Sequence, residues 1–165
     1  MKNIVLIGMP GTGKSTVGVL LAKSLLMDFC DTDLIIQKIY SVPLCDIIAD
    51  IGTEGFIRAE DDILSELTPE NTVIATGGSA VYGENAMKNL KNNGIAVYLD
   101  TPLSEIEKRL CNIHTRGVAM KEGTTIGELF REREPLYQKY SDITVDCSGL
   151  SPEECVEKIV ELIKN

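Results

Sequence analysis

The stretch GMPGTGKS, residues 8–15, matches the pattern G-x-x-x-x-G-K-[ST]. It follows an apolar run at residues 4–7 and precedes residues 16–26, which have helical periodicity. Glycines let backbone N–H groups close around phosphate oxygens, and the helix that follows directs its positive end at them. Lys14 supplies a cation and Ser15 a hydroxyl for Mg²⁺. The stretch therefore predicts a phosphate-binding loop between a strand and a helix.

Length and composition set the broad class of protein. A chain of 165 residues is large enough for one full core and too short for a second domain. Its 44% hydrophobic and 25% charged residues are ordinary for a globular protein. No apolar run approaches the roughly 18 residues of a membrane span, and residues 1–3 lead into a strand rather than a signal peptide. We expect one cytoplasmic domain over residues 1–165, a monomer without a membrane contact.

The charge balance and the cysteines exclude further classes. The net charge of −9 and the low pI argue against nucleic acid as a partner, because nucleic-acid binding needs a basic face. The five cysteines are scattered without a C-x-x-C pair, so they predict neither a zinc site nor a disulfide framework. If the ligand is anionic, local cations must overcome the negative field of the whole chain.

Short apolar runs alternate with amphipathic stretches along the chain, which predicts an α/β domain with a parallel sheet. The expected strands are Asn3–Ile7, Phe29–Cys30, Thr72–Ala75, Ile95–Leu99 and Ile143–Val145. The expected helices are Lys14–Leu26, Leu34–Tyr40, Leu44–Ile48, Gly55–Leu67, Glu84–Asn93, Pro102–Leu110, Ile126–Tyr137 and Pro152–Lys164. Gly94 is the expected C-cap of the fifth helix. In such sheets ligands lie beyond the carboxyl ends of the strands, so the loops after the first three strands should converge.

Two carboxylates, Asp31 and Asp33, follow the second expected strand. At positions i and i+2 they leave the strand end on the same side, which faces the phosphate loop. One can hold Mg²⁺ through water while the other orients, or takes a proton from, an attacking hydroxyl. The alternative is a solvated turn with Asp33 as a helix N-cap. The neighbouring phosphate loop favours the functional interpretation.

The third expected strand ends in Thr76-Gly77-Gly78-Ser79. Paired glycines after a buried strand allow a ligand or another backbone to approach closely, and the two flanking residues add hydroxyls. By itself the motif is weak. Its position after an apolar strand predicts the floor of an acceptor site.

Cations lie in the second half of the chain. Residues 112–123 lack clear periodicity and carry two glycines, which predicts a lid that closes and excludes water. Closure would bring Arg116 to the transferring phosphate, although a solvent-facing loop arginine is the alternative. Residues 131–137 alternate in charge, which is typical of a solvated helix face.

Together these motifs resemble those of the shikimate kinase family of small P-loop kinases, over nearly the whole chain. That family has a phosphate loop near the N-terminus, D-T-D after the second strand, G-x-x-x-F-R-x-x-E, T-G-G-G after the third strand, an arginine in a lid, and R-x-P-L-Y. The corresponding positions here, in the same order, are residues 8–15, 31–33, 52–60, 76–79, Arg116 and residues 133–137.

The resemblance implies a fold and a reaction. The implied fold is an α/β P-loop kinase with a five-stranded parallel sheet of order 2-3-1-4-5, flanked by helices. An acceptor-binding region is expected at residues 34–66 and a lid at residues 112–124. The implied reaction uses ATP and Mg²⁺ to phosphorylate a hydroxyl of a small molecule, shikimate, giving shikimate 3-phosphate.

The resemblance also implies a role for each site residue. Mg²⁺ is held by Ser15 and, through water, by Asp31. The catalytic residues are Lys14, Asp33 and Arg116. ATP is bound by Gly11, Thr12, Gly13, Lys14, Ser15 and Thr16, with Arg109 against the adenine. The acceptor is bound by Asp33, Arg58, Gly77, Gly78, Ser79 and Arg133, whose forked donors suit a carboxylate.

Three positions depart from the family pattern. Ile57 stands where the family has an arginine that grips the acceptor carboxylate, and Arg58 lies one place further on. One residue turns a helical side chain by about 100°, so Arg58 is expected to project elsewhere unless the helix rewinds. Ser79 replaces the third glycine and puts a side chain into the acceptor floor, and Gly117 replaces a proline after the lid arginine.

Three hypotheses remain from the sequence. The first is a shikimate kinase in which Arg58 or Arg133 binds the acceptor carboxylate. The second is a related kinase for another small hydroxy acid or polyol, because Ile57 and Ser79 alter the acceptor site. The third is a nucleotide-binding regulator without catalysis, which the retained Lys14 and aspartate pair disfavour.

Overall fold

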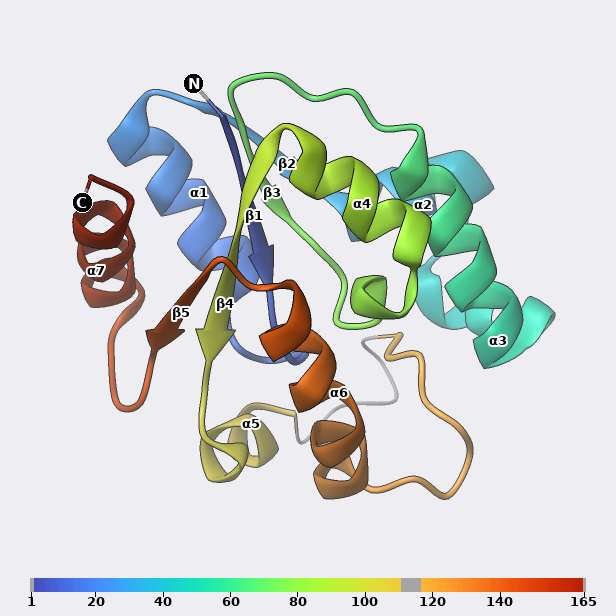
Figure 1. Cartoon of the computed structure of the whole chain (residues 1–165). Coiled ribbons are helices and arrows are strands. Elements are labelled where there is room, and N and C mark those ends of the chain that lie inside the picture. The colour runs from blue at the N-terminus through green and yellow to red at the C-terminus, as the bar shows by residue number, and fades with distance from the viewer. Residues whose placement is uncertain (1, 111–116, 165) are drawn as a thin grey trace.

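The computed structural model describes residues 2–110 and 117–164 (Figure 1). Its centre is a five-stranded sheet in which all neighbouring strands are parallel, in the order β2-β3-β1-β4-β5. The strands are β1 (Asn3–Ile7), β2 (Asp28–Asp31), β3 (Thr72–Ala75), β4 (Gly94–Asp100) and β5 (Ile143–Asp146). The predicted fold class and strand order are confirmed. Within the described ranges, no helix is long and apolar enough to cross a bilayer.

Helices cover both faces of the sheet. They are α1 (Lys14–Leu25), α2 (Thr32–Tyr40), α3 (Leu44–Ser65), the 3₁₀ turn η1 (Ala80–Tyr82), α4 (Glu84–Asn92), α5 (Leu103–Arg109), α6 (Ile126–Tyr140) and α7 (Pro152–Lys164). In Figure 1, α1 and α7 lie together on one side of the sheet, and α3, α4 and α6 lie on the other.

Two apolar layers follow from the alternation of side chains along each strand. Val5 and Ile7 of β1 point to one face and pack in a cluster with residues of α3, α4 and α6. Ile4 and Leu6 point to the other face and pack with residues of α1 and α7. Because β1 is buried on both faces, it reads as a continuous apolar run, as central strands of parallel sheets do. Because both faces of β1 are packed in the core, the position of the loop that follows β1 is fixed.

The structure corrects two local predictions. The two helices predicted at residues 44–48 and 55–67 are joined into α3, with Gly52 as a kink at φ 73° and ψ 169°. This backbone conformation strongly favours glycine, so the break in periodicity marked a kink rather than a loop. Gly94 does not cap α4: Asn93 is the cap, and Gly94 begins β4. A Cβ at Gly94 would meet the Leu90 carbonyl oxygen at 2.4 Å, which explains the glycine by close approach.

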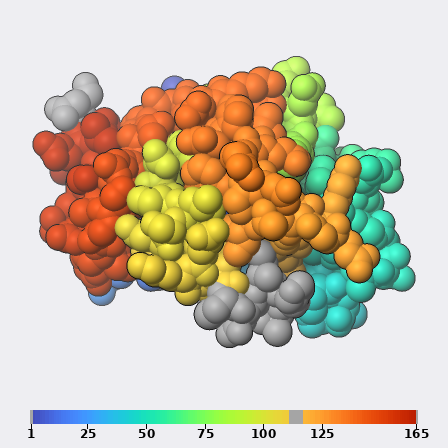
Figure 2. Space-filling model, turned by 90° about the horizontal axis from the view of Figure 1, so that it is seen from below, coloured from blue at the N-terminus to red at the C-terminus, as the bar shows by residue number. Residues whose placement is uncertain are grey.

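The loops that carry the candidate site gather at the carboxyl ends of the strands. Figure 2 views the molecule from this side, with α5 in yellow between α6 in orange and α7 in red. Residues of α3, in teal, lie on the far side of α6. The Gly77 N–H donates to Thr32 Oγ1 at 3.1 Å, and this bond ties the segments after β2 and β3 together. The convergence predicted for the loops after the first three strands is therefore present in the structure.

Candidate active site

The phosphate loop joins β1 to α1 in a backbone shape that favours glycine. Gly11 and Gly13 have φ values of 84° and 89°, in the left-handed region. Gly13 is the N-cap of α1, and no side chain caps this helix end or places an acidic group in its first turn. The first N–H groups of α1 therefore keep their hydrogen-bonding capacity for an anion. By contrast, Thr125 and Glu128 form a complete capping box at the start of α6.

Lys14 lies folded back over this loop. Its ammonium donates to the carbonyl oxygens of Gly8 and Met9 at 2.7 and 2.8 Å. Burial lowers the pKa of Lys14 to about 8, and the Asp33 carboxylate opposes this shift. The cation is therefore held inside the site by two carbonyls and a nearby carboxylate, in position to move to a phosphate oxygen.

Ser15 and Asp31 meet at the start of α1 and the end of β2. Ser15 Oγ donates to Asp31 Oδ2 at 2.6 Å, while Asp31 Oδ1 accepts from the backbone N–H of Asp33 at 3.0 Å. Asp31 is thus the N-cap of α2, and the N-cap considered for Asp33 is not formed. Among the described residues no group of three or more His, Cys, Asp or Glu side chains gathers to hold a metal. A hydroxyl beside one carboxylate fits Mg²⁺, which takes few protein oxygens and completes its shell with phosphates and water.

Asp33 stands at the start of α2 and faces the same cavity as the phosphate loop. Burial, then the charge of Asp31, raise the pKa of Asp33 to about 6, and Lys14 opposes them. A carboxylate with a pKa near 6 is a better proton acceptor than an exposed aspartate and is still ionised at neutral pH.

One cavity of about 590 Å³ unites these groups. Its size is in the range of small-molecule sites. The residues that line it come from the phosphate loop, from α1, α2, α3, α5, α6 and α7, from the loop after β3, from residues 117–119 and from the β5–α7 loop. Those predicted as site residues are Gly11, Gly13, Lys14, Ser15, Asp33, Gly77, Gly78, Ser79, Arg109 and Arg133. Thr12 and Thr16 line it as well. The structure therefore brings the predicted phosphate-binding and acceptor residues into one space.

Arg133 of α6, a predicted acceptor ligand, is a buried cation that lines this cavity, with 1% of its surface exposed. Its Nη2 donates to the Ala119 carbonyl, and its Nε donates to the Tyr82 hydroxyl at 3.4 Å. The guanidinium also lies over the Tyr82 ring, 5.3 Å from its centre. Nη1 lies beside Gly78, where a Cβ would meet it at 2.9 Å. The charge alternation around Arg133 suggested a solvated face, but the structure buries this arginine.

Glu60 of α3 is the site residue that sequence reasoning missed. It is 1% exposed, and its Oε2 accepts from Ser79 Oγ at 2.5 Å. Burial is the main cause that raises the pKa of Glu60 to about 7, and the Ser79 bond opposes it. The Ser79 side chain, expected to intrude on the acceptor floor, is thus directed at Glu60. The sequence prediction used Glu60 only as the last residue of the family pattern G-x-x-x-F-R-x-x-E. The sequence does not indicate whether an acidic residue on a predicted helix is buried.

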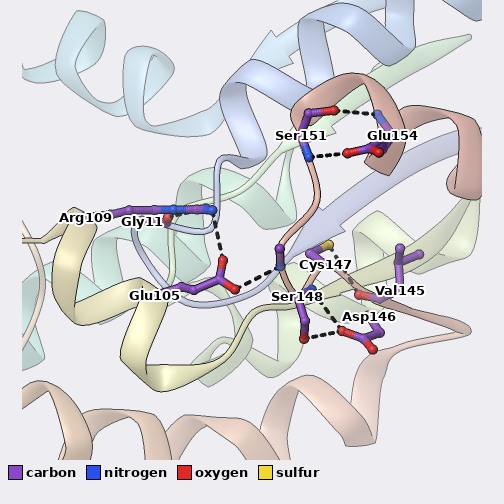
Figure 3. Close-up of polar contacts among 10 residues, drawn as sticks. Gly11, Glu105, Arg109, Val145, Asp146, Cys147, Ser148, Ser151 and Glu154 are labelled. Carbon is purple, nitrogen blue, oxygen red and sulfur yellow. Dashed lines mark hydrogen bonds and ion pairs between the residues drawn. The ribbon is translucent and has the colours of Figure 1, made fainter.

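Arg109 of α5 also lines the cavity and lies beside the phosphate loop (Figure 3). Its Nη1 donates to the Gly11 carbonyl at 3.3 Å and its Nη2 pairs with Glu105 at 3.2 Å. Glu105 in turn accepts from the Gly149 N–H at 2.9 Å, in the loop between β5 and α7. These contacts place the guanidinium between the phosphate loop and the β5–α7 loop, where a base could lie.

Two predicted arginines are not part of this arrangement. Arg58 is exposed and does not line the cavity, and within the described chain it makes no hydrogen bond or ion pair. Ile57 beside it is half-buried and does not line the cavity either. Arg116 lies outside the described residues, together with residues 112–115 of the predicted lid. Of the two arginines predicted to bind the acceptor, Arg133 lines the cavity and Arg58 does not.

The fold and the cavity define a class. An uncapped helix after a glycine loop, a loop lysine and a Ser–Asp pair suited to Mg²⁺ are the parts of a P-loop kinase. The shikimate kinase family model matches residues 10–164, and the chain belongs to this family. It is an ATP-dependent small-molecule kinase that uses ATP with Mg²⁺.

Individual proteins support this assignment. A shikimate kinase from Thermodesulfovibrio yellowstonii is 40% identical over 164 residues, which cover 98% of this chain and 94% of that protein. A solved shikimate kinase from Acinetobacter baumannii in complex with shikimate has a TM-score of 0.91 at 32% identity, covering 99% of this chain and 93% of that chain. Human threonine synthase-like 1 is 37% identical over 166 residues, and the match spans 22% of that protein.

The raised pKa of Glu60 predicts a stability effect. Because the pKa is about 7 in the folded protein against an ordinary 4.5, folding disfavours the charged form. The contribution of Glu60 to the unfolding free energy therefore falls as pH rises from about 4.5 to 7 and stays low above. Glu60→Gln should raise the unfolding free energy at pH 8 by at most about 3 kcal/mol.

The same substitution should have no such effect near pH 4.5, where wild-type Glu60 is neutral. Denaturant titrations at pH 4.5 and pH 8 measure the difference. Glu66→Gln, an identical change at an exposed position after α3, is the control. A loss of stability for Glu60→Gln at pH 8 would contradict the assigned burial cost.

Proposed function

We propose that this enzyme transfers the γ-phosphoryl group of ATP to the 3-hydroxyl of shikimate, giving ADP and shikimate 3-phosphate. The observation that carries the proposal is the placement of Asp33 and Arg133 in one cavity with the phosphate loop. Family membership and the relative solved with shikimate support this acceptor. We place the reaction in the cytoplasm and assign it to a monomer.

The proposed reaction follows from the positions of the chain's own groups. The N–H groups at the start of α1 hold the phosphates, and Lys14 moves from the Gly8 and Met9 carbonyls to a phosphate oxygen. Ser15 and Asp31 hold Mg²⁺, which neutralises phosphate charge when bound. The acceptor oxygen bonds to the γ-phosphorus as the bond to ADP breaks, and Asp33 takes the hydroxyl proton.

Arg133 is the proposed ligand of the acceptor carboxylate. Ala119 and Tyr82 fix two of its nitrogens, so the guanidinium is oriented before the acceptor arrives. Nη1 on the Gly78 side remains for a carboxylate oxygen. Arg109 is proposed to lie against the adenine, and Arg116 to close over the phosphates with a lid at residues 112–124. The acceptor-binding region is proposed at residues 34–66.

The other hypotheses have less support. A different hydroxy acid or polyol as the acceptor is not favoured, because the family model and the 40% identical relative are both shikimate kinases. A regulator without catalysis is disfavoured by the intact Lys14, Ser15 and aspartate pair around one cavity.

Asp33→Asn tests the catalytic step. An amide of the same shape cannot take the hydroxyl proton, so kcat should fall at least about 100-fold, while Mg·ATP affinity changes less than about threefold. A coupled ADP-release assay with shikimate and a nucleotide-binding titration measure the two quantities. Asp28→Asn, at an exposed position in β2, is the control. Unchanged turnover in Asp33→Asn would refute the assigned role.

Arg133→Lys tests carboxylate recognition. Lysine keeps the charge but loses the forked donors and the contacts with Ala119 and Tyr82. The KM for shikimate should rise about 10- to 100-fold, with the KM for ATP nearly constant. Arg131→Lys, exposed on the same helix, is the control. Equal losses for shikimate and for ATP would show that Arg133 supports the fold rather than the acceptor.

A further inference from the structure

Two cysteines line the cavity that holds the phosphate loop. Cys147 follows β5 and Cys155 lies near the start of α7, and both are lining residues. Each is free and buried, with 4% and 5% of its surface exposed. In the sequence, residues 148–154 separate them, and this spacing matches no metal or redox motif. Their proximity is therefore a property of the fold.

The turn between β5 and α7 places one thiol on each side of it. The Leu150 N–H donates to the Cys147 carbonyl at 3.1 Å, and the Cys155 N–H donates to the Ser151 carbonyl at 3.0 Å. Ser151 and Glu154 exchange hydrogen bonds of 2.8 and 3.2 Å, which fix the start of α7 (Figure 3). Both cysteines then pack in the apolar cluster between the sheet and α1 with α7.

The two thiols interact directly. Burial is the main cause that raises the pKa of the Cys147 thiol, followed by the charge of Cys155 and a side-chain hydrogen bond with it. The acidic groups that face Cys147, Asp146 of β5 and Asp100 of β4, act in the same direction. The Cys147 thiol also donates to the Val145 carbonyl at 3.4 Å. Cys147 is thus held protonated beside the sulfur of Cys155.

The β5–α7 turn is tied to the arginine that is proposed to contact adenine. Arg109 pairs with Glu105 at 3.2 Å, and Glu105 accepts from the Gly149 N–H at 2.9 Å. Leu150 and Pro152, which lie between the two cysteines in the sequence, line the cavity as well. A base against Arg109 would therefore lie next to this turn and separate the thiols from the rest of the cavity. Without a base, a small oxidant in the cavity can reach them.

We propose that Cys147 and Cys155 form an oxidation site in the wall of the nucleotide-binding part of the cavity, where a hydroperoxide joins them in a reversible disulfide and bound nucleotide prevents it. The inference goes beyond the proposed function and uses only the proposed place of adenine beside Arg109. Nothing in the spacing of the cysteines along the sequence indicates such a site.

The proposed oxidation has two steps. One thiol attacks the hydroperoxide, so that the O–O bond breaks, the distal oxygen forms a sulfenic acid, and the other oxygen leaves as an alcohol or water. The second thiol displaces the sulfenic hydroxyl as water, and the S–S bond forms. Two electrons pass from the sulfurs to the peroxide oxygens, and the thiol protons leave in the products. We assign the first attack to Cys155, because the raised pKa of Cys147 makes that thiol a poor nucleophile.

The disulfide should change nucleotide binding more than acceptor binding. Bond formation brings the two sulfurs to about 2 Å from each other and pulls the start of α7 towards the end of β5. Leu150 and Pro152 lie within the closed loop and in the cavity wall. The KM for ATP should therefore rise about 3- to 10-fold, with the KM for shikimate nearly constant. Dithiothreitol should restore the original KM.

Peptide mapping of the whole protein after exposure to hydrogen peroxide tests the proposal. Remaining thiols are alkylated before digestion. Trypsin leaves both cysteines in one peptide, residues 140–158, whose mass falls by two hydrogen atoms when the disulfide forms. Cleavage after Glu153 or Glu154 then leaves two fragments joined by the disulfide. Mg·ADP at about ten times its dissociation constant should slow the reaction about tenfold, because only the nucleotide-free protein reacts.

Three variants serve as controls. Cys147→Ser and Cys155→Ser should each abolish the disulfide, whereas Cys30→Ser should leave it unchanged, because Cys30 is a half-buried residue of β2 that does not line the cavity. Recovery of peptide 140–158 with both thiols reduced, or with a sulfinic acid in place of the disulfide, would overturn the inference. Equal rates with and without Mg·ADP would also overturn it. Failure of the reduced enzyme to phosphorylate shikimate would instead overturn the proposed function.

Discussion

The free N-terminus of α1, with Lys14 folded over it, is the constraint on which the site depends. Gly13 caps α1 without a side chain, so the helix offers its first N–H groups to an anion. The double burial of β1 holds this loop in place. The chain carries a net charge of −9, so the phosphate-binding end must supply its own local positive potential.

Burial of charged side chains changes their pKa values in and beside the cavity. Lys14, Asp33 and Arg133 line one cavity, and Glu60 is buried behind Ser79 in its wall. Burial shifts the pKa values of Lys14, Asp33 and Glu60 towards the neutral forms. Each costs stability by itself, and each is partly offset by a neighbour of opposite charge. Such tension between stability and function is common at active sites. Here it yields a proton acceptor and an oriented guanidinium.

Most of the fold was predictable from local pattern. The phosphate loop, the apolar strands and the strand order follow from periodicity and from the family resemblance, and the structure has them within a few residues. The roles of Gly52 and Gly94 were mispredicted. A glycine that interrupts a periodic pattern can mark a kink, a helix cap or a close approach of two segments, and the sequence pattern is the same in all three cases. These alternatives differ only in long-range contacts.

Site residues that belong to a motif of known chemistry were predictable from the sequence. Site residues whose position depends on which side chains are buried were not. Asp31, Asp33 and Lys14 were found from spacing, whereas Glu60 and the inward turn of Arg133 depend on how α3 and α6 pack. The most direct test is a crystal structure with Mg·ADP and shikimate. We expect the 3-hydroxyl within about 3.2 Å of the Asp33 carboxylate and the acceptor carboxylate on Arg133. An Asp33 side chain turned away from the β-phosphate, with shikimate bound elsewhere, would contradict phosphoryl transfer at this site.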